Sequence, residues 1–447
     1  MVTDLTKGDP FRTIWRFSIP MLLSMAFQQM YQLADGMIAG RYIGMDALGA
    51  VGASHSITTL FLSAASGSAM GVSVVVSQQF GAGILKNVNC AVSTAVRWLM
   101  AFAAVLTVAG LPLSGSLLQL LGTPEELMEA GRLYLQIYVL GIPFLFLYNF
   151  ANGTFNALGD SKTPLYFLIF SSLLNIVLDI ALVVQFKLGI FGIAFATWLA
   201  QGIAGVLATL LVLRRVRLLC PPVERKFDRG LFKEMLRIGI PSIVQQSCTS
   251  LGQMSIQSVI NSYGHTVVAG YSAAFKLNTL VVIALNTLSN AISSYVAQNL
   301  GAKNLTRIKQ GVRAGAKMMF GLAVGVTVAL LAGGSFWIKI FMEQNPDIQA
   351  VAAGTSFLYI VSPFYLMVCF KVVTDGALRG IGAMKEFMIA NFADLIMRVI
   401  FSIIMSKLFG YLGIWWVWPM AWVVGTSLSV GFYFKKMRFL NSLDDMI

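Results

Sequence analysis

Long apolar runs separated by short polar segments repeat along the whole chain. Each run holds about 20 residues or more, the length that an α-helix needs to cross the hydrocarbon core of a bilayer. Lipid cannot satisfy open backbone hydrogen bonds, so we expect the spans to be helices. The runs also exceed the segments of about ten residues that are typical of a membrane β-barrel. The predicted spans cover residues 14–39, 47–80, 91–113, 133–158, 165–184, 192–213, 238–263, 267–300, 312–342, 351–377, 387–408 and 413–434.

The twelve runs form two sets of six with matching sequence landmarks. Pro20 in the first run corresponds to Pro241 in the seventh, and Pro143 corresponds to Pro363 at nearly the same offset. Because six spans is an even number, both halves should have the same orientation. This is the parallel repeat of transporters that bind their substrate between the halves, near the bilayer midplane. We therefore predict an N-lobe at residues 1–213, a cytoplasmic loop at 214–237 and a C-lobe at 238–447.

Composition supports an all-α membrane protein. The chain is 57% hydrophobic and 11% charged, whereas soluble domains hold about 25% charged residues. A net charge of +13 could reflect nucleic-acid binding, but most Lys and Arg residues fall in alternate loops, as expected of cytoplasmic loops. We predict a multi-pass protein of the plasma (inner) membrane, in contact with the lipid bilayer, with both termini cytoplasmic and no nucleic-acid partner. The first run is too long to be the apolar part of a cleavable signal.

Four polar side chains interrupt the spans of the first half. Asn175 and Asp179 are four residues apart and so share a helix face, while Asp35 and Thr197 lie in the first and sixth spans. A carboxylate at membrane depth is costly and by default marks a function. Oxygen ligands suit a hard cation such as Na+, and the carboxylates could equally carry protons. Structural explanations stay open for these residues. Asp35 could be hydrated near the end of its helix, Asn175 could only join two helices by a hydrogen bond, and the Thr197 hydroxyl could bond its own helix backbone.

In the second half the charged residues can neutralise each other. Lys371 and Asp375 are four residues apart, as are Asp394 and Arg398, and this spacing allows direct pairing on a helix. We expect intramembrane ion pairs with a structural role. The two halves therefore differ, and the coupling site is predicted in the N-lobe.

Uncharged amide side chains recur at helical spacing within several predicted spans. They could face a cavity and hydrogen-bond varied substrates, or they could join helices to each other. Two Gly-x-x-x-Gly patterns, Gly67 with Gly71 and Gly321 with Gly325, are expected to let helices pack closely. The candidate residues of a substrate cavity are Gln28, Gln32, Gln246, Gln253, Gln257 and Asn286.

The sequence lacks the motifs of the relevant enzyme classes. It contains no Gly-x-x-x-x-Gly-Lys-Ser/Thr phosphate loop, so we do not expect it to hydrolyse ATP. With two His residues and no His-Glu-x-x-His pattern, it is not expected to be a metal hydrolase. We predict no enzymatic activity and no cofactor, with a gradient of H+ or Na+ as the energy source.

Several segments together resemble the multidrug and toxic compound extrusion (MATE) family, prokaryotic type, over nearly the whole chain. They are QLADGMIAGR at 32–41, ALGAVG at 47–52, QQFGAG at 78–83, NALGDSKTP at 156–164 and GALRG at 376–380. The resemblance implies a V-shaped pair of six-helix lobes that exports cationic, amphipathic compounds in exchange for protons or sodium ions. It also implies an N-lobe cation site, which would consist of Asp35, Asn175, Asp179 and Thr197. Some relatives use acidic residues on the seventh span, and residues 238–263 contain none, which favours the N-lobe.

We therefore predict a secondary active multidrug efflux antiporter that works by alternating access, acts on small molecules and is a monomer. The first alternative is a flippase for lipid-linked or polysaccharide precursors. A flippase would need a basic central cavity, and the spans hold few basic residues besides Lys371 and Arg398. The second alternative is a non-transporting receptor or scaffold, against which the internal repeat and the unequal carboxylates argue.

Overall fold

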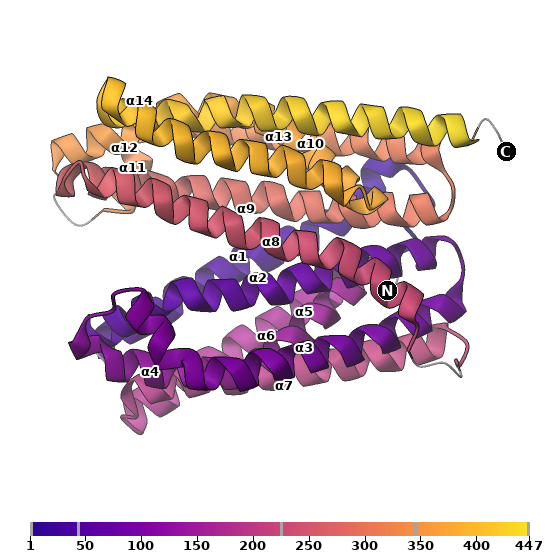
Figure 1. Cartoon of the computed structure of the whole chain (residues 1–447), viewed down its shortest axis with the longest axis horizontal. Helices are drawn as coiled ribbons and strands as arrows, with labels where there is room; N and C mark the ends of the chain where they lie inside the picture. Colours follow the sequence, from indigo (N-terminus) through magenta and orange to yellow (C-terminus); the bar gives the residue numbers. More distant parts are fainter. Residues whose placement is uncertain (1–2, 43–44, 224–226, 343–346, 445–447) are drawn as a thin grey trace. The chain divides into compact units, whose positions relative to one another are not determined.

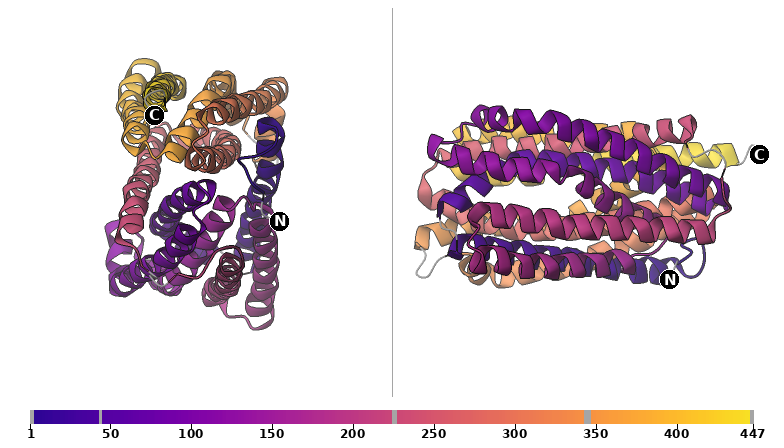
Figure 2. Two further views of the ribbon diagram at one scale, coloured as in Figure 1. Left: turned by 90° about the vertical axis from the view of Figure 1, so that its right-hand side faces the viewer. Right: turned by 90° about the horizontal axis from the view of Figure 1, so that it is seen from below.

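Nearly all of the described chain is helical. The computed structural model describes residues 3–42, 45–223, 227–342 and 347–444, except for the side chains of residues 34, 35, 39, 41, 45–48, 443 and 444. No β-strand occurs in these ranges, which confirms the all-α prediction. Figures 1 and 2 show that the long helices of each half run side by side.

The helices follow the apolar runs of the sequence in order. In the first half they are α1 (Pro10–Tyr42), α2 (Met45–Gly81), α3 (Leu85–Leu120), α4 (Glu125–Leu140), α5 (Ile142–Ala157), α6 (Lys162–Asp179), the π-helix η1 (Ile180–Gln185) and α7 (Gly189–Leu219). In the second half they are α8 (Arg229–Asn261), α9 (His265–Gly301), α10 (Leu305–Ala332), α11 (Gly334–Ile340), α12 (Ile348–Val361), the 3-10 turn η2 (Ser362–Phe364), α13 (Tyr365–Ile381) and α14 (Met384–Asp444).

Twelve crossings can be assigned to these helices. Within the described ranges, eight helices are long and apolar enough to cross a membrane, and the bent pair α4 and α5 would make a ninth. α14 provides two crossings, because Gly410 has a φ of +64° and breaks the helix in the middle. α1 and α8 are more polar, yet each has 33 residues and is long enough to span.

Several predicted spans are broken where the sequence pattern is continuous. α4 and α5 meet at a bend of 48° inside the predicted span 133–158. Pro143 lies in the first turn of α5, and proline has no N–H to continue the hydrogen bonds of a preceding helix. Pro363 similarly lies in η2, between α12 and α13. The apolar pattern therefore predicts the length of a span but not its straightness.

Small residues allow α2 and α8 to pack closely. A Cβ atom on Gly67 would lie 2.6 Å from the backbone nitrogen of Ile243, and one on Gly71 would lie 2.4 Å from the backbone oxygen of Met235. α2 therefore packs directly on the backbone of α8, as the first Gly-x-x-x-Gly pattern predicts. In the second pattern, on α10, a Cβ atom added to Gly321 or Gly325 would meet no other helix within 4 Å among the described residues. The prediction of close packing is wrong there, because no helix backbone approaches those glycines.

The chain divides into two compact units, and two of the three divisions along the chain fall inside a helix. One unit contains Met1–Asp4 and Ile19–Ile243, and the other contains Leu5–Ser18 and Val244–Ile447. The division inside α1 is close to Pro20 and the division inside α8 is close to Pro241. α5 packs on α2 and α7 in the first unit, and α9 packs on α12 and α13 in the second. The lobe and loop boundaries 1–213, 214–237 and 238–447 stay a prediction.

Candidate cation-coupling site

Two polar side chains are buried at the end of α6. Asn175 is 2% exposed and Asp179 is 0% exposed, and Asp179 is the last residue of the α-helix. From Ile180 to Gln185 the chain continues as the π-helix η1, although the sequence predicts an unbroken span over residues 165–184. Short π-helical segments are rare in proteins, and those that occur are often found at functional sites. Here the irregular turn begins directly after the buried carboxylate.

The Asn175 amide connects three helices. In the orientation that satisfies its neighbours, its nitrogen donates to Asp179 Oδ2 at 2.9 Å and to the Tyr31 hydroxyl oxygen at 3.2 Å, and its oxygen accepts from the backbone N–H of Thr197 at 3.1 Å. The amide also lies 3.3 Å from the Thr197 hydroxyl. α1, α6 and α7 therefore meet at one side chain. The structure brings together Asn175, Asp179 and Thr197, three of the four residues predicted for the cation site.

α1 contributes Tyr31, which the sequence analysis did not single out. It also contains Asp35, which was predicted for the site. Tyr31 was missed, although it is adjacent to Gln32 and lies four residues before Asp35, next to a polar stripe of the helix. That position was the signal that could have found it, since a phenol both donates and accepts hydrogen bonds. Asp35 has its backbone in α1, one turn after Tyr31. Its side chain lies outside the described part of the structure, so its role stays a prediction.

The arrangement supplies oxygen atoms of three kinds. Asp179 provides a carboxylate, Thr197 and Tyr31 provide hydroxyl groups, and Asn175 provides an amide oxygen. Oxygen ligands hold hard cations, and a carboxylate buried at membrane depth can hold a proton instead. Either ion would neutralise a carboxylate that is fully enclosed by protein. The described residues therefore fit the chemistry predicted for this site.

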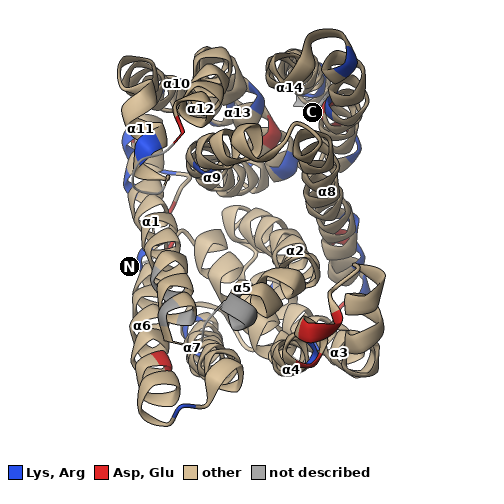
Figure 3. Ribbon diagram, turned by 90° about the vertical axis from the view of Figure 1, so that its left-hand side faces the viewer, with Lys and Arg blue, Asp and Glu red and all other residues tan. Residues whose placement is uncertain are grey.

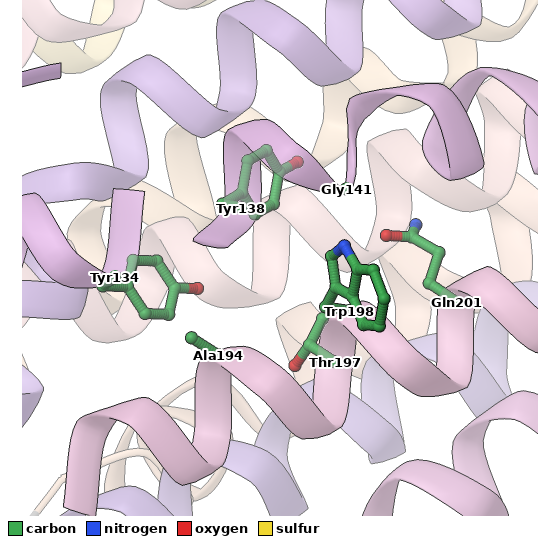
Figure 4. Close-up of a pocket in the computed structure, with 7 residues that line it drawn as sticks. All are labelled: Tyr134, Tyr138, Gly141, Ala194, Thr197, Trp198 and Gln201. Carbon is green, nitrogen blue, oxygen red and sulfur yellow. The ribbon is translucent and has the colours of Figure 1, made fainter. Parts of the chain in front are cut away.

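A small cavity lies beside Thr197. Its volume is about 10 Å³, and its walls include the aromatic rings of Tyr134, Tyr138 and Trp198 (Figure 4). A space of this size is close to the minimum that holds one water molecule. Gly141, Ala194 and Gln201 complete the lining. The cavity is too small for an organic substrate, but it provides room for hydration next to the Thr197 hydroxyl.

The predicted ion pairs of the second half are formed and buried. Lys371 Nζ lies 2.9 Å from Asp375 Oδ2, and an Arg398 nitrogen lies 2.8 Å from Asp394 Oδ2. The Arg398 guanidinium also lies over the Trp418 ring, 4.3 Å from its centroid, which is a cation–π contact. Figure 3 shows that most of the helical ribbon carries no charged residue. The two pairs are thus local exceptions, each neutral in itself.

The predicted cavity amides differ in their surroundings. Gln28 and Gln32 on α1 and Asn286 on α9 are exposed. Gln257 donates to Asn261 of its own helix at 2.8 Å. Gln246 is half-buried, and its backbone carbonyl accepts from the Ser250 hydroxyl at 3.2 Å; Gln253 is exposed. A role in substrate binding stays a prediction for all six residues.

Comparison with known families explains the internal repeat. The MatE family model matches residues 20–181 and again residues 241–404, once in each half and over most of the chain. The chain belongs to the MatE family. The two MatE matches begin at Pro20 and Pro241, the landmarks that align the two sets of spans in the sequence.

Relatives of this MatE chain match it along nearly its whole length. It is 33% identical over 414 residues to the probable multidrug resistance protein YpnP of Bacillus subtilis (strain 168), with 92% of both chains covered. It is 29% identical over 448 residues to the probable multidrug resistance protein YoeA of the same organism, with 96% of this chain and 94% of YoeA covered. An outward-facing structure of a multidrug resistance MATE family transporter of the MOP superfamily has a TM-score of 0.91, 23% identity and 99% of both chains covered.

Family membership and fold agree on the class of protein. MatE proteins are transporters, so the chain is a multi-pass membrane transporter of small molecules and not an enzyme. The structural match confirms the predicted fold of twelve helices in two six-helix lobes.

Proposed function

We propose that this MatE transporter exports cationic, amphipathic small molecules in exchange for protons or sodium ions. Both Bacillus subtilis relatives are named as multidrug resistance proteins, which supports a broad range of substrates. The observation that carries the proposal is the cluster of oxygen atoms on three helices, in which Asn175 and Asp179 are buried and the half-buried Thr197 and Tyr31 contact Asn175. A cluster of this kind can bind a cation and transmit its binding to all three helices.

The coupling step acts through the Asn175 amide. Its nitrogen donates both to Asp179 and to Tyr31, so it joins α6 to α1. When a proton or a sodium ion neutralises Asp179, the Asn175 amide loses its charged acceptor or shares it with the ion. The Asn175 amide is then free to reorient, which alters its contact with Tyr31 of α1 and so changes the relative stability of the outward-facing and inward-facing states. In this cycle, ion binding from outside releases the substrate and favours the inward-facing state.

The proposal also covers the location of the transporter and the charge of its substrates. The transporter lies in the plasma membrane as a monomer, with both termini in the cytoplasm and no cofactor besides the coupling ion. A flippase for phosphate-bearing precursors would need unpaired positive charge in a cavity. The buried Lys371 and Arg398 each have a carboxylate partner within 3 Å, which supports cationic rather than anionic substrates.

Transport by reconstituted vesicles tests the coupling residue. Efflux of a fluorescent lipophilic cation is measured with a proton gradient and with a sodium gradient, each imposed separately. Asp179→Asn keeps the size of the side chain but removes the charge that an ion neutralises, so gradient-driven export should fall by roughly tenfold or more. Asp347→Asn is the matched control, because Asp347 is an exposed carboxylate at the start of α12, and it should retain wild-type export.

The outcomes separate the possibilities. The gradient that drives the wild-type protein identifies the coupling ion. Undiminished gradient-driven export by Asp179→Asn would refute the assignment of Asp179 as the coupling carboxylate.

A further inference from the structure

Asp375 on α13 is a charged group of the second unit that contacts several polar side chains. Its Oδ1 accepts a short hydrogen bond from the hydroxyl of Ser429, and its Oδ2 accepts from the amide of Asn391 at 3.3 Å. Thr374 extends this set, because its hydroxyl donates to the Ser429 oxygen at 3.0 Å. Asp375 is 6% exposed and Ser429 is 0% exposed. Oxygen atoms of α13 and of both parts of α14 therefore converge at one point.

The ammonium group of Lys371 lies at that point. It donates to Asp375 Oδ2 at 2.9 Å and to Asn391 Oδ1 at 2.8 Å. Its side chain reaches this position past Gly425, where a Cβ atom would lie 2.7 Å from Lys371 Cε. The missing side chain at 425 thus leaves room for the lysine. The ammonium-bearing and carboxylate-bearing side chains have exposed fractions of 8% and 9%, so the pair is largely but not completely enclosed.

This environment has the chemistry of a cation site. A carboxylate, an amide oxygen and neighbouring hydroxyl groups are the ligands that hard cations prefer. A buried carboxylate that loses its partner is costly, by several kcal/mol, so the position needs a positive charge. Arg379 is the other cation close to Asp375, but its guanidinium donates to Ser289 Oγ at 2.7 Å and stacks over the Phe387 ring.

We propose that the Lys371 ammonium is a built-in cation that permanently fills a monovalent cation site formed by Asp375 and Asn391, in which Ser429 holds the other oxygen of the Asp375 carboxylate. The second half therefore has a cation site that does not exchange its ion. Removing the lysine side chain opens this site to Na+ or K+. The inference concerns residues outside the proposed coupling cluster and does not depend on the transport mechanism.

Cation-dependent thermal stability of the purified full chain tests the proposal. The melting temperature of Lys371→Ala is measured in NaCl, KCl and n-propylammonium chloride, with choline chloride keeping the ionic strength constant. We expect the melting temperature of Lys371→Ala to rise saturably with at least one of the small cations. This rise should exceed that of the wild-type protein, whose response measures any cation binding by the first half. Lys371→Met fills the space without a charge, and Lys371→Ala/Asp375→Asn removes both charges; both should lack the extra rise.

Each outcome decides the question. If Lys371→Ala is folded and shows no response beyond that of the wild-type protein, the pair is an ordinary buried salt bridge and the proposal is overturned. If Lys371→Ala can be purified only in buffers that contain Na+, K+ or n-propylammonium, the proposal is supported. Failure to recover it in any of these buffers, while Lys371→Ala/Asp375→Asn folds, counts against it, because an accessible site would have been filled.

Discussion

Asp160→Asn is expected to lower the free energy of unfolding by about 2 kcal/mol. Asp160 lies between α5 and α6 and is 1% exposed. Its Oδ1 accepts from the backbone N–H groups of Lys162 and Thr163 at 3.2 and 3.1 Å, and its Oδ2 accepts from the Thr163 hydroxyl at 2.7 Å and from the Arg215 guanidinium. One carboxylate therefore caps the start of α6 and holds the last part of α7.

The magnitude follows from which of these bonds an amide can replace. The oxygen of Asn can still accept from the two backbone N–H groups, so the helix cap is retained. The charged bond to Arg215 is lost, and such bonds contribute about 1.5–3 kcal/mol. The Arg215 side chain is 25% exposed, so water replaces part of the lost interaction and the cost falls in the lower part of that range, about 2 kcal/mol.

The same residue gives a pH dependence of definite sign. Burial would raise the pKa of Asp160, but the hydrogen bonds from Thr163 and Arg215 outweigh burial and lower the pKa below its usual value. An unfolded Asp titrates near pH 3.9. The stabilisation is therefore complete well above that value and is lost as the pH falls through the folded pKa. Below about pH 5, the wild-type protein should lose stability more steeply than Asp160→Asn.

The assay is denaturant unfolding in detergent micelles at pH 7, repeated at lower pH. A double-mutant cycle with Arg215→Gln isolates the charged bond, because the Arg215 change should have little further effect once Asp160 is neutral. A wild-type free energy of unfolding for Asp160→Asn at pH 7, or strict additivity of the two changes, would refute this account of the junction.

Two further predictions concern the chain start and the coupling cluster. Gly159→Ala should destabilise the folded protein by clearly more than Gly122→Ala. Both positions have φ above +70°, so an alanine at either one costs about 1–2 kcal/mol of backbone strain. Only at Gly159 would the Cβ atom also clash with the Thr3 backbone oxygen, 1.9 Å away. Equal melting temperatures of the two variants would contradict this. Tyr31→Phe removes the hydroxyl that contacts Asn175 and should raise the concentration of coupling ion needed for half-maximal export, with the maximal rate less affected; an unchanged ion dependence would show that the hydroxyl takes no part in coupling.

The sequence predicted features that depend on local spacing. The spans follow from the length of the apolar runs, and the repeat follows from landmarks such as Pro20 and Pro241. Asn175 and Asp179 could be paired because four residues make about one turn of any helix. The same rule anticipated the geometry of the Lys371 and Asp375 pair.

Features that depend on distant partners could not be predicted. Two identical Gly-x-x-x-Gly patterns behave differently, because only the one on α2 meets another helix backbone. The position of Tyr31 beside a polar stripe could have suggested a polar role, but its partner Asn175 is known only where α6 approaches α1. The π-helix after Asp179 is invisible to apolar periodicity. Asp160 belongs to a segment that suggested the family, but its bond to Arg215 joins residues 55 positions apart.

The prolines at the unit divisions have a mechanical consequence. Pro20 lies near the division inside α1 and Pro241 near the division inside α8. A proline cannot donate to the carbonyl four residues earlier, so an α-helix resists bending least at that point. Each of these two helices is therefore most easily bent near the point where it passes from one compact unit to the other. A load applied to either helix would concentrate curvature near its proline, away from the buried Asp179 on α6 and Asp375 on α13.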